Sequence, residues 1–236
     1  MIIGRKYGLF LFYFLWIKKQ NNLEGKIKNM KTILDHMRSL LDSAYLFNLL
    51  EKVAGVGSVR KRIIKDFVAP FDGASILDIG CGTGAILDYF PNNIDYIGFD
   101  ISHKYINHAK NKYKNRGKFY CASITDNINT LSESSFDFVI SFGVIHHLSD
   151  DDATILIKKA KKYLKKNGIF ITIDPVYVDN QSTFSRLLID NDRGEYVRDT
   201  DGYMSLFLDV FSKTQGLVIN DMLTYSYDYY ITQSKK

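Results

Sequence analysis

The sequence of 236 residues is poor in cysteine and proline. Its two cysteines, Cys81 and Cys121, cannot form a disulfide framework, so a reducing, cytoplasmic location is expected. Three prolines and 16 glycines exclude a collagen-like or linker-rich chain. With 46% hydrophobic and 24% charged residues, a chain of this length can bury a sizeable core, which excludes a disordered tail.

An excess of positive over negative charge is also absent from most of the chain, despite a net charge of +5. Residues 1–29 hold six basic residues and one acidic residue, and residues 30–236 hold 25 of each sign. A neutral body lacks the positive surface that phosphate backbones require. We therefore do not expect nucleic acid as a partner, although this balance leaves room for a local basic patch.

No hydrophobic run in the N-terminal segment is long enough to span a membrane. The apolar run over residues 7–17 is shorter than the roughly 17–25 residues that a spanning helix needs. Lys18 and Lys19 follow it, where a signal peptide would have small cleavage-site residues. Two interpretations stay open. The segment is either an interfacial anchor, which aromatic residues beside lysines suit, or an upstream extension, structured or unstructured, of a protein that begins at Met30.

Residues 30–72 are predicted to form an N-terminal helical cap. Apolar residues recur at intervals of three and four from Ile33 to Val53, the period of an amphipathic helix. A second, shorter helix has Ser58 as its expected N-cap and ends before Pro70.

Residues 73–236 alternate between strand and helix patterns, which predicts an α/β domain with a mostly parallel, doubly wound sheet. Several strand candidates are continuous apolar runs, as expected of strands buried on both faces. Beyond Pro175 the alternation ends in a polar stretch, a helix near 203–211 and β-like runs at 217–225 and 227–232. The earlier candidate strands are 75–79, 96–99, 118–121, 138–142 and 169–173, and the candidate helices are 85–90, 104–114 and 153–164.

A glycine-rich turn follows the first of these strands. Gly80, Gly82 and Gly84 allow a tight turn and let the backbone approach a ligand beside the positive end of a helix. With Ala85 in the next position, the spacing is also compatible with a dinucleotide-binding fingerprint. The spacing alone therefore does not distinguish nucleotide cofactors.

Five consecutive motifs resemble those of the class I S-adenosylmethionine-dependent methyltransferases. They cover residues 73–175 in order and at the spacing of that family: Leu77-Asp78-Ile79-Gly80-Cys81-Gly82-Thr83-Gly84, Ile97-Gly98-Phe99-Asp100-Ile101-Ser102, Phe136-Asp137-Phe138-Val139-Ile140-Ser141, Gly143-Val144-Ile145-His146-His147-Leu148 and Leu164-Lys165-Lys166-Asn167-Gly168-Ile169-Phe170. The resemblance implies a Rossmann-like seven-stranded sheet, S-adenosylmethionine as the cofactor and methyl transfer as the reaction.

The resemblance also implies which residues contact the cofactor. Asp100 would accept hydrogen bonds from the ribose diol, and Asp78 would lie near the methionine ammonium group. Ser123 departs from the family pattern, which has an acid at the adenine, and it offers a weaker, uncharged acceptor. The full expected set is Asp78, Gly80, Cys81, Gly82, Gly84, Asp100, Ile101, Ser123, Ile124, Phe142 and Gly143.

Two adjacent histidines, His146 and His147, follow the fourth strand, near the expected position of the transferable methyl group. An unperturbed histidine titrates close to neutrality, so either residue is a candidate general base. The alternative is that the pair shapes the pocket or the entry to a helix. Because two adjacent histidines without further spaced ligands make a poor metal site, no metal is expected.

A substrate lid is expected over residues 176–203, between the fifth strand and the last helix. It resembles a D-R-G, V-R, G-Y pattern of a bacterial subgroup. The candidate substrate-binding residues are Asp174, Arg193, Arg198 and Tyr203. The alternative is a surface loop that is closed by pairs of arginine and aspartate.

The acceptor of the methyl group stays open at this level. A small molecule with an oxygen, nitrogen or carbon nucleophile is the favoured hypothesis. A protein or RNA acceptor is the alternative within the enzyme class, and a catalytically silent binding module is the alternative outside it. The sequence does not predict the oligomeric state.

Overall fold

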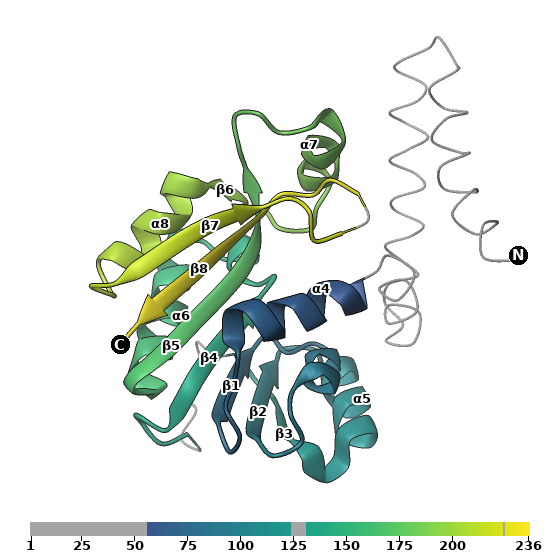
Figure 1. The fold of residues 1–236 in the computed structure, drawn as a ribbon, viewed down its shortest axis with the longest axis vertical. Coiled ribbons are helices and arrows are strands. Elements are labelled where there is room, and N and C mark those ends of the chain that lie inside the picture. Colours follow the sequence, from purple (N-terminus) through teal and green to yellow (C-terminus); the bar gives the residue numbers. More distant parts are fainter. Residues whose placement is uncertain (1–55, 124–130, 224) are drawn as a thin grey trace, which may run out of the picture. The chain divides into compact units, whose positions relative to one another are not determined.

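A computed structural model describes residues 56–123, 131–223 and 225–236, all within the unit Asn48–Lys236 (Figure 1). The predictions for the extension over residues 1–29, the apolar run over 7–17, the helix over 33–53 and Ile124 lie outside this part of the chain. No helix within it has the length and apolar character needed to cross a membrane.

The centre of the fold is a sheet with the strand order β3-β2-β1-β4-β5-β8-β7 (Figure 1). Strands β1 to β5 pair in parallel, β8 runs antiparallel to both β5 and β7, and the short β6 pairs in parallel with β5. This confirms the predicted mostly parallel, doubly wound sheet and adds the short strand β6. The strands are β1 Ser75–Ile79, β2 Asp95–Asp100, β3 Lys118–Cys121, β4 Phe136–Phe142, β5 Leu164–Tyr177, β6 Arg198–Asp199, β7 Thr214–Ile219 and β8 Tyr229–Lys235.

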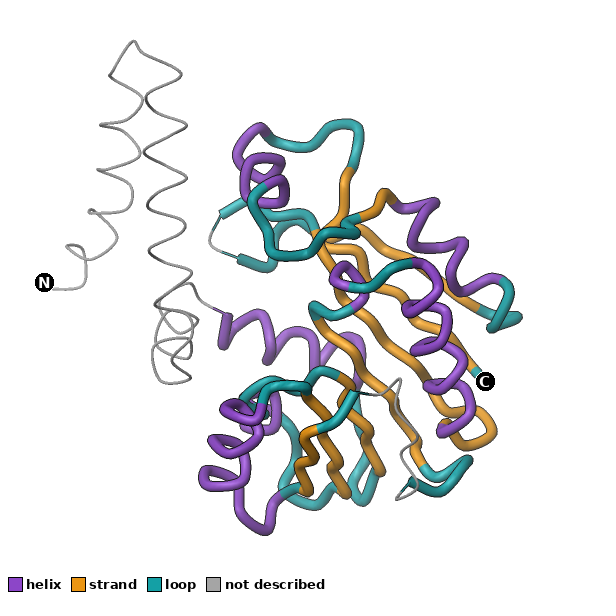
Figure 2. The backbone as a smooth tube through the Cα atoms, turned by 180° about the vertical axis from the view of Figure 1, so that it is seen from behind, coloured by secondary structure: helices purple, strands orange, loops and turns teal. Residues whose placement is uncertain are grey.

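Helices cover both faces of the sheet, which explains why its central strands are continuous apolar runs. Ile76 and Ile140 pack in one core with residues of α4 and α5. Leu77 and Val139 belong to the other core, with residues of α6 and α8. Figure 2 shows helices on both sides of the strands. Burial of adjacent strand residues on opposite faces is what a doubly wound sheet requires.

The helices lie where the sequence predicts them, but their bounds and types differ from the prediction. Ser102 caps α5, since its hydroxyl accepts from the Tyr105 amide. The helix that was expected to begin at Ser58 already includes Val56, and the one expected over 85–90 is a 3-10 helix. The helices are α4 Val56–Ile63, the π-helix η1 Ile64–Val68, the 3-10 helices η2 Ala85–Tyr89, η3 Lys114–Arg116 and η4 Ile145–His147, and α5 His103–Tyr113, α6 Asp150–Tyr163, α7 Thr183–Asp190 and α8 Thr200–Leu208.

The carboxyl ends of the parallel strands meet at one edge of the sheet. In open α/β sheets this edge binds ligands, because the loops that follow the strands converge there. The glycine-rich turn follows β1, Asp100 ends β2, and Gly143 follows β4. The fold therefore brings most of the predicted cofactor and catalytic residues to a common edge.

Candidate active site at the carboxyl edge of the sheet

All three glycines of the turn after β1 have positive φ angles. The values are +79° at Gly80, +54° at Gly82 and +70° at Gly84, a region that other residues rarely adopt. A Cβ atom at Gly80 would lie 2.3 Å from Val144 Cγ2, whereas one at Gly82 would meet nothing within 4 Å. The turn is thus packed at its first glycine and open at its second, where a ligand can approach the backbone.

Asp100 connects this turn to the beginning of α5. Its Oδ2 accepts from the Gly82 amide at 2.9 Å, and its Oδ1 accepts from the Ser102 amide at 2.8 Å. A carboxylate oxygen can accept more than one hydrogen bond, so both oxygens keep acceptor capacity for a ribose diol. The adjacent Ile101 side chain is 77% exposed and offers an apolar surface beside that acid.

Asp78 is buried beneath the same turn, with 3% of its surface exposed. Burial raises the pKa of its carboxyl group from 3.8 to about 7, and the nearby Asp100 charge also raises it. The Tyr96 hydroxyl donates to Asp78 Oδ2 at 2.5 Å and opposes this rise. Asp78 is therefore close to half protonated near neutral pH unless a positive charge approaches it.

Cys81 is a packing residue of the turn. Burial raises the pKa of its thiol far above the ordinary value, so the reactive thiolate is suppressed. A Cβ atom at Gly98 would lie 2.8 Å from Cys81 Sγ, which shows how closely the thiol packs on β2. Its expected contact with the cofactor stays a prediction.

The remaining predicted cofactor residues lie on the loops after β3 and β4. Ser123 is half-buried two residues after β3, and Phe142 is half-buried at the end of β4. Gly143 is exposed, has a φ of +70° and donates its amide hydrogen to Ile173 O at 2.7 Å. The structure thus places these three residues at the edge that holds the glycine-rich turn.

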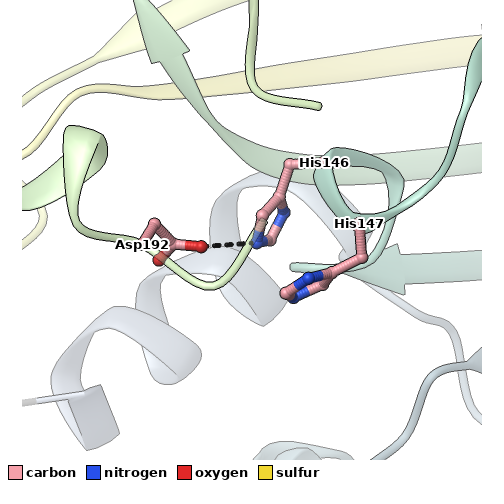
Figure 3. Close-up of side chains that lie close together, drawn as sticks. All are labelled: His146, His147 and Asp192. Carbon is pink, nitrogen blue, oxygen red and sulfur yellow. Dashed lines mark ion pairs between the residues drawn. The ribbon is translucent and has the colours of Figure 1, made fainter. Parts of the chain in front are cut away.

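His146 is buried between two carboxylates. Its Nδ1 lies 2.8 Å from Asp174 Oδ1, and its Nε2 lies 3.2 Å from Asp192 Oδ1 (Figure 3). Burial alone would lower the pKa of the imidazole, but the two carboxylates outweigh it and raise the pKa to about 9. Both ring nitrogens are engaged, so in this arrangement His146 fixes the loop that carries Asp192.

His147 has a different environment from its neighbour. Its side chain is exposed, and its ring centroid lies 4.1 Å from that of His146 (Figure 3). Burial of part of the ring and the adjacent His146 charge lower its pKa. Of the two histidines expected to be catalytic, only His147 presents its ring to solvent, and a catalytic role for either stays a prediction.

Arg198 holds the loop between β5 and α8. Its Nε and Nη2 donate to Asp150 Oδ1 at 2.9 and 2.6 Å, and its side chain is 10% exposed. It also donates to the carbonyl oxygens of Ile145, Leu148 and Tyr196. These contacts use the donors of Arg198 within the chain and favour the alternative of a loop closed by arginine and aspartate, while a substrate role for Arg198 stays an untested prediction.

The other expected substrate residues differ in their access to the surface. Asp174 and Tyr203 are each 1% exposed, and Asp174 Oδ1 is bonded to His146, so neither faces an acceptor directly. Arg193 is exposed and lies next to Gly194. Of the four residues, only Arg193 keeps the accessible position that a substrate contact needs.

Sequence reasoning did not find Asp192 as a partner of His146. Asp192 approaches because Gly194 packs directly on the imidazole, where a Cβ atom would lie 2.0 Å from His146 Cδ2. The Tyr196 amide then donates to His146 O at 2.9 Å. The glycine that follows Asp192 and Arg193 was the available signal, since it allows this close approach.

Comparison with known proteins identifies the domain that contains this site. Residues 77–172 match a family model described as "Methyltransferase domain". This part of the chain is a methyltransferase domain, in agreement with the resemblance of its motifs to the class I S-adenosylmethionine-dependent methyltransferases. S-adenosylmethionine is the cofactor of that family, and the matched residues of the methyltransferase domain include the glycine-rich turn, Asp100 and both histidines.

Individual relatives align with part of this chain. "Probable tRNA methyltransferase 9B" of Homo sapiens is 32% identical over 57% of this chain and 30% of its own length. "Phosphoethanolamine N-methyltransferase" of Triticum aestivum is 23% identical over 57% of this chain and 27% of its own. The chain thus spans less than a third of the length of either relative.

A solved structure supports the fold over a longer stretch. A S-adenosylmethionine-dependent methyltransferase from Archaeoglobus fulgidus superposes with a TM-score of 0.63 at 17% identity. The match covers 81% of this chain and all of the other. At this identity the likeness concerns the fold of the methyltransferase domain.

Proposed function

We propose that this protein transfers a methyl group from S-adenosylmethionine to a small-molecule acceptor in the cytoplasm. The observation that carries the cofactor assignment is the pairing of Asp100 with the open glycine turn. Two carboxylate oxygens with remaining acceptor capacity lie beside a backbone that a ligand can approach at Gly82. Exposed Ile101 adds an apolar surface for a purine ring.

The residues present fit the charge of this cofactor as well as its shape. Buried Asp78 holds a proton up to about neutral pH. An ammonium group beside it would favour the ionised carboxylate, and the pair would then neutralise each other away from water. We assign Asp78 to the methionine end and Asp100 to the ribose.

The bound cofactor supplies the electrophilic methyl group, and the chain's residues orient the acceptor and exclude water. Displacement at the methyl carbon needs the acceptor in line with the breaking carbon–sulfur bond. The loop after β4, with Gly143 at its start, lies at the edge where this approach would occur. The hydrogen bonds of Arg198 and the packing of Gly194 hold the chain before α8 against the residues that follow β4. The acceptor side of the site is therefore ordered before the acceptor binds.

The acceptor class is supported by the neutral charge of residues 30–236 and by the relative named for phosphoethanolamine. The relative named for tRNA favours RNA as a second candidate acceptor. Both candidates use the same cofactor site and differ in what reaches the methyl group. They are therefore separable by experiment.

The test incubates the full chain with methyl-labelled S-adenosylmethionine and three fractions of a cell extract: small molecules, protein and RNA. Mass spectrometry then locates the label. We expect label in the small-molecule fraction and its loss in Asp100→Ala, with Asp95→Ala, an exposed aspartate of β2, as the matched control. Label in the nuclease-sensitive fraction would instead identify RNA, and cofactor binding without label in any fraction would indicate a binding module.

A further inference from the structure

The structure brings a third potential metal ligand to the two adjacent histidines. Among the described residues, His146, His147 and Asp192 each offer one ligand atom, and these atoms all lie within 4.8 Å of one another (Figure 3). The histidines belong to η4, which begins two residues after Gly143, and Asp192 comes from the loop after α7. This juxtaposition was not visible in the sequence, where the histidines stand without further spaced ligands.

We propose that His146, His147 and Asp192 bind a divalent transition-metal ion at the acceptor side of the methyltransferase site. Two imidazoles and one carboxylate are a donor set that suits Zn²⁺ and related first-row ions, and three protein ligands leave coordination positions open for another molecule. The ion site goes beyond methyl transfer, and its use in catalysis rests on the proposed function.

The distance between the ligand atoms of His146 and Asp192 fits a shared ion. His146 Nε2 and Asp192 Oδ1 are 3.2 Å apart. Ligand bonds of roughly 2.0–2.2 Å in tetrahedral geometry place neighbouring ligand atoms about 3.3 Å apart. The ring of His147 is tilted against that of His146 with the centroids 4.1 Å apart, and its ligand nitrogen lies within 4.8 Å of the other two ligand atoms.

The surroundings of His146 and Asp192 hold them as metal ligands are usually held. His146 Nδ1 lies 2.8 Å from Asp174 Oδ1, so Nε2 is the nitrogen that faces Asp192, and a bound ion would replace the proton of Nε2. A carboxylate behind a ligating histidine fixes its tautomer and orientation. Asp192 Oδ1 in turn accepts from the Gly194 amide at 2.8 Å, so the carboxylate also has a fixed position.

An ion at this place would activate an acceptor hydroxyl group. The hydroxyl oxygen would take an open coordination position, and its proton would pass to solvent water because the ion lowers its pKa. The oxygen then forms a bond to the methyl carbon while the carbon–sulfur bond breaks and its electron pair stays on sulfur. The products are the methylated oxygen and S-adenosylhomocysteine, so no further reactant is needed.

The experiment measures ion binding by the full chain without reference to activity. Chelator-treated protein is titrated with Co²⁺ and followed by its visible absorption spectrum, which reports coordination by nitrogen and oxygen ligands. Zn²⁺ is then added as a competitor, and equilibrium dialysis gives the stoichiometry. The variants are His147→Ala, which changes an exposed side chain, and Asp192→Asn, with His103→Ala as a control for an exposed histidine elsewhere.

We expect one Zn²⁺ per chain in wild type and in His103→Ala, and a Kd at least about tenfold weaker in His147→Ala and in Asp192→Asn. The absence of Zn²⁺ binding, or equal binding in all four proteins, overturns the ion site. Label transfer that continues at full rate after the ion is removed overturns its use in catalysis. Zn²⁺ binding without transfer to any fraction would instead retain the ion site and refute the proposed function.

Discussion

Buried Asp78 makes the stability of the protein depend on pH in an unusual direction. Its pKa is about 7 in the folded chain and 3.8 in an unfolded one. Between these values the folded chain keeps a proton that the unfolded chain releases, so stability falls as pH rises. At about 1.36 kcal/mol per pH unit, the full effect is roughly 4 kcal/mol, of which about 3 kcal/mol falls between pH 5 and 8.

The perturbation is Asp78→Asn, which keeps the size of the side chain and an acceptor for the Tyr96 hydroxyl but removes the titration. Urea unfolding of the full chain without cofactor gives the free energy of unfolding at intervals from pH 5 to 8. We expect wild type to lose about 3 kcal/mol more than Asp78→Asn over this interval. Asp95→Asn, on the exposed surface of the neighbouring strand, should keep the slope of wild type.

The asparagine can change the free energy of unfolding by an amount that does not depend on pH. Such a change leaves the slope against pH unaltered, so comparing slopes isolates the titration of Asp78. Parallel pH dependences in wild type and Asp78→Asn would refute the argument that burial holds the proton on Asp78. The same proton links cofactor binding to pH, because an ammonium group beside Asp78 favours its release. Affinity for S-adenosylmethionine should therefore rise from pH 6 to 8 in wild type, and calorimetry of Asp78→Asn should show a flatter dependence.

Three further predictions concern the cofactor turn and the loop before α8. Asp100→Ala should weaken S-adenosylmethionine binding by roughly 1.5–3 kcal/mol, and unchanged affinity by calorimetry in a folded variant would refute the ribose assignment. Arg198→Ala should lower the free energy of unfolding by about 2 kcal/mol with little change in cofactor affinity, whereas Arg193→Ala should leave stability close to wild type. Gly194→Ala should displace the loop from His146, which limited proteolysis would detect as faster cleavage; wild-type resistance would contradict the close packing.

The sequence was most informative where local pattern and burial agree. The bounds of β1 and β3 were predicted to the residue, because each is a short run between clear breaking signals. The fifth strand was predicted over 169–173 but extends over Leu164–Tyr177, since pairing with β4 and β8 carries it through positions that look polar or broken, Pro175 among them. Pairing of this kind depends on distant residues and is not visible in a local window.

The candidate site likewise contains residues that local sequence patterns predict and contacts that they do not predict. The glycine-rich turn, Asp100 and the histidine pair were predicted because each lies at or shortly after the end of a strand, in a motif that resembles those of the methyltransferase family. The partnership of His146 with Asp192 was not predicted, because it depends on how the chain between β5 and α8 returns to the sheet. Arg198 was assigned to substrate for the same reason, since its partner Asp150 lies on another element.

The pairing of β6 with β5 defines how this part of the chain can change during evolution. Val176 pairs with Arg198 and Tyr177 with Asp199, so the segment over residues 178–197 leaves and re-enters the fold at adjacent points. Loop-closure entropy grows slowly with length, so an insertion or exchange within the segment, α7 included, costs the sheet little. The same segment carries Asp192 and Arg193, so under the proposed function an exchange within it would change the acceptor preference and leave the cofactor turn and the strand order unchanged.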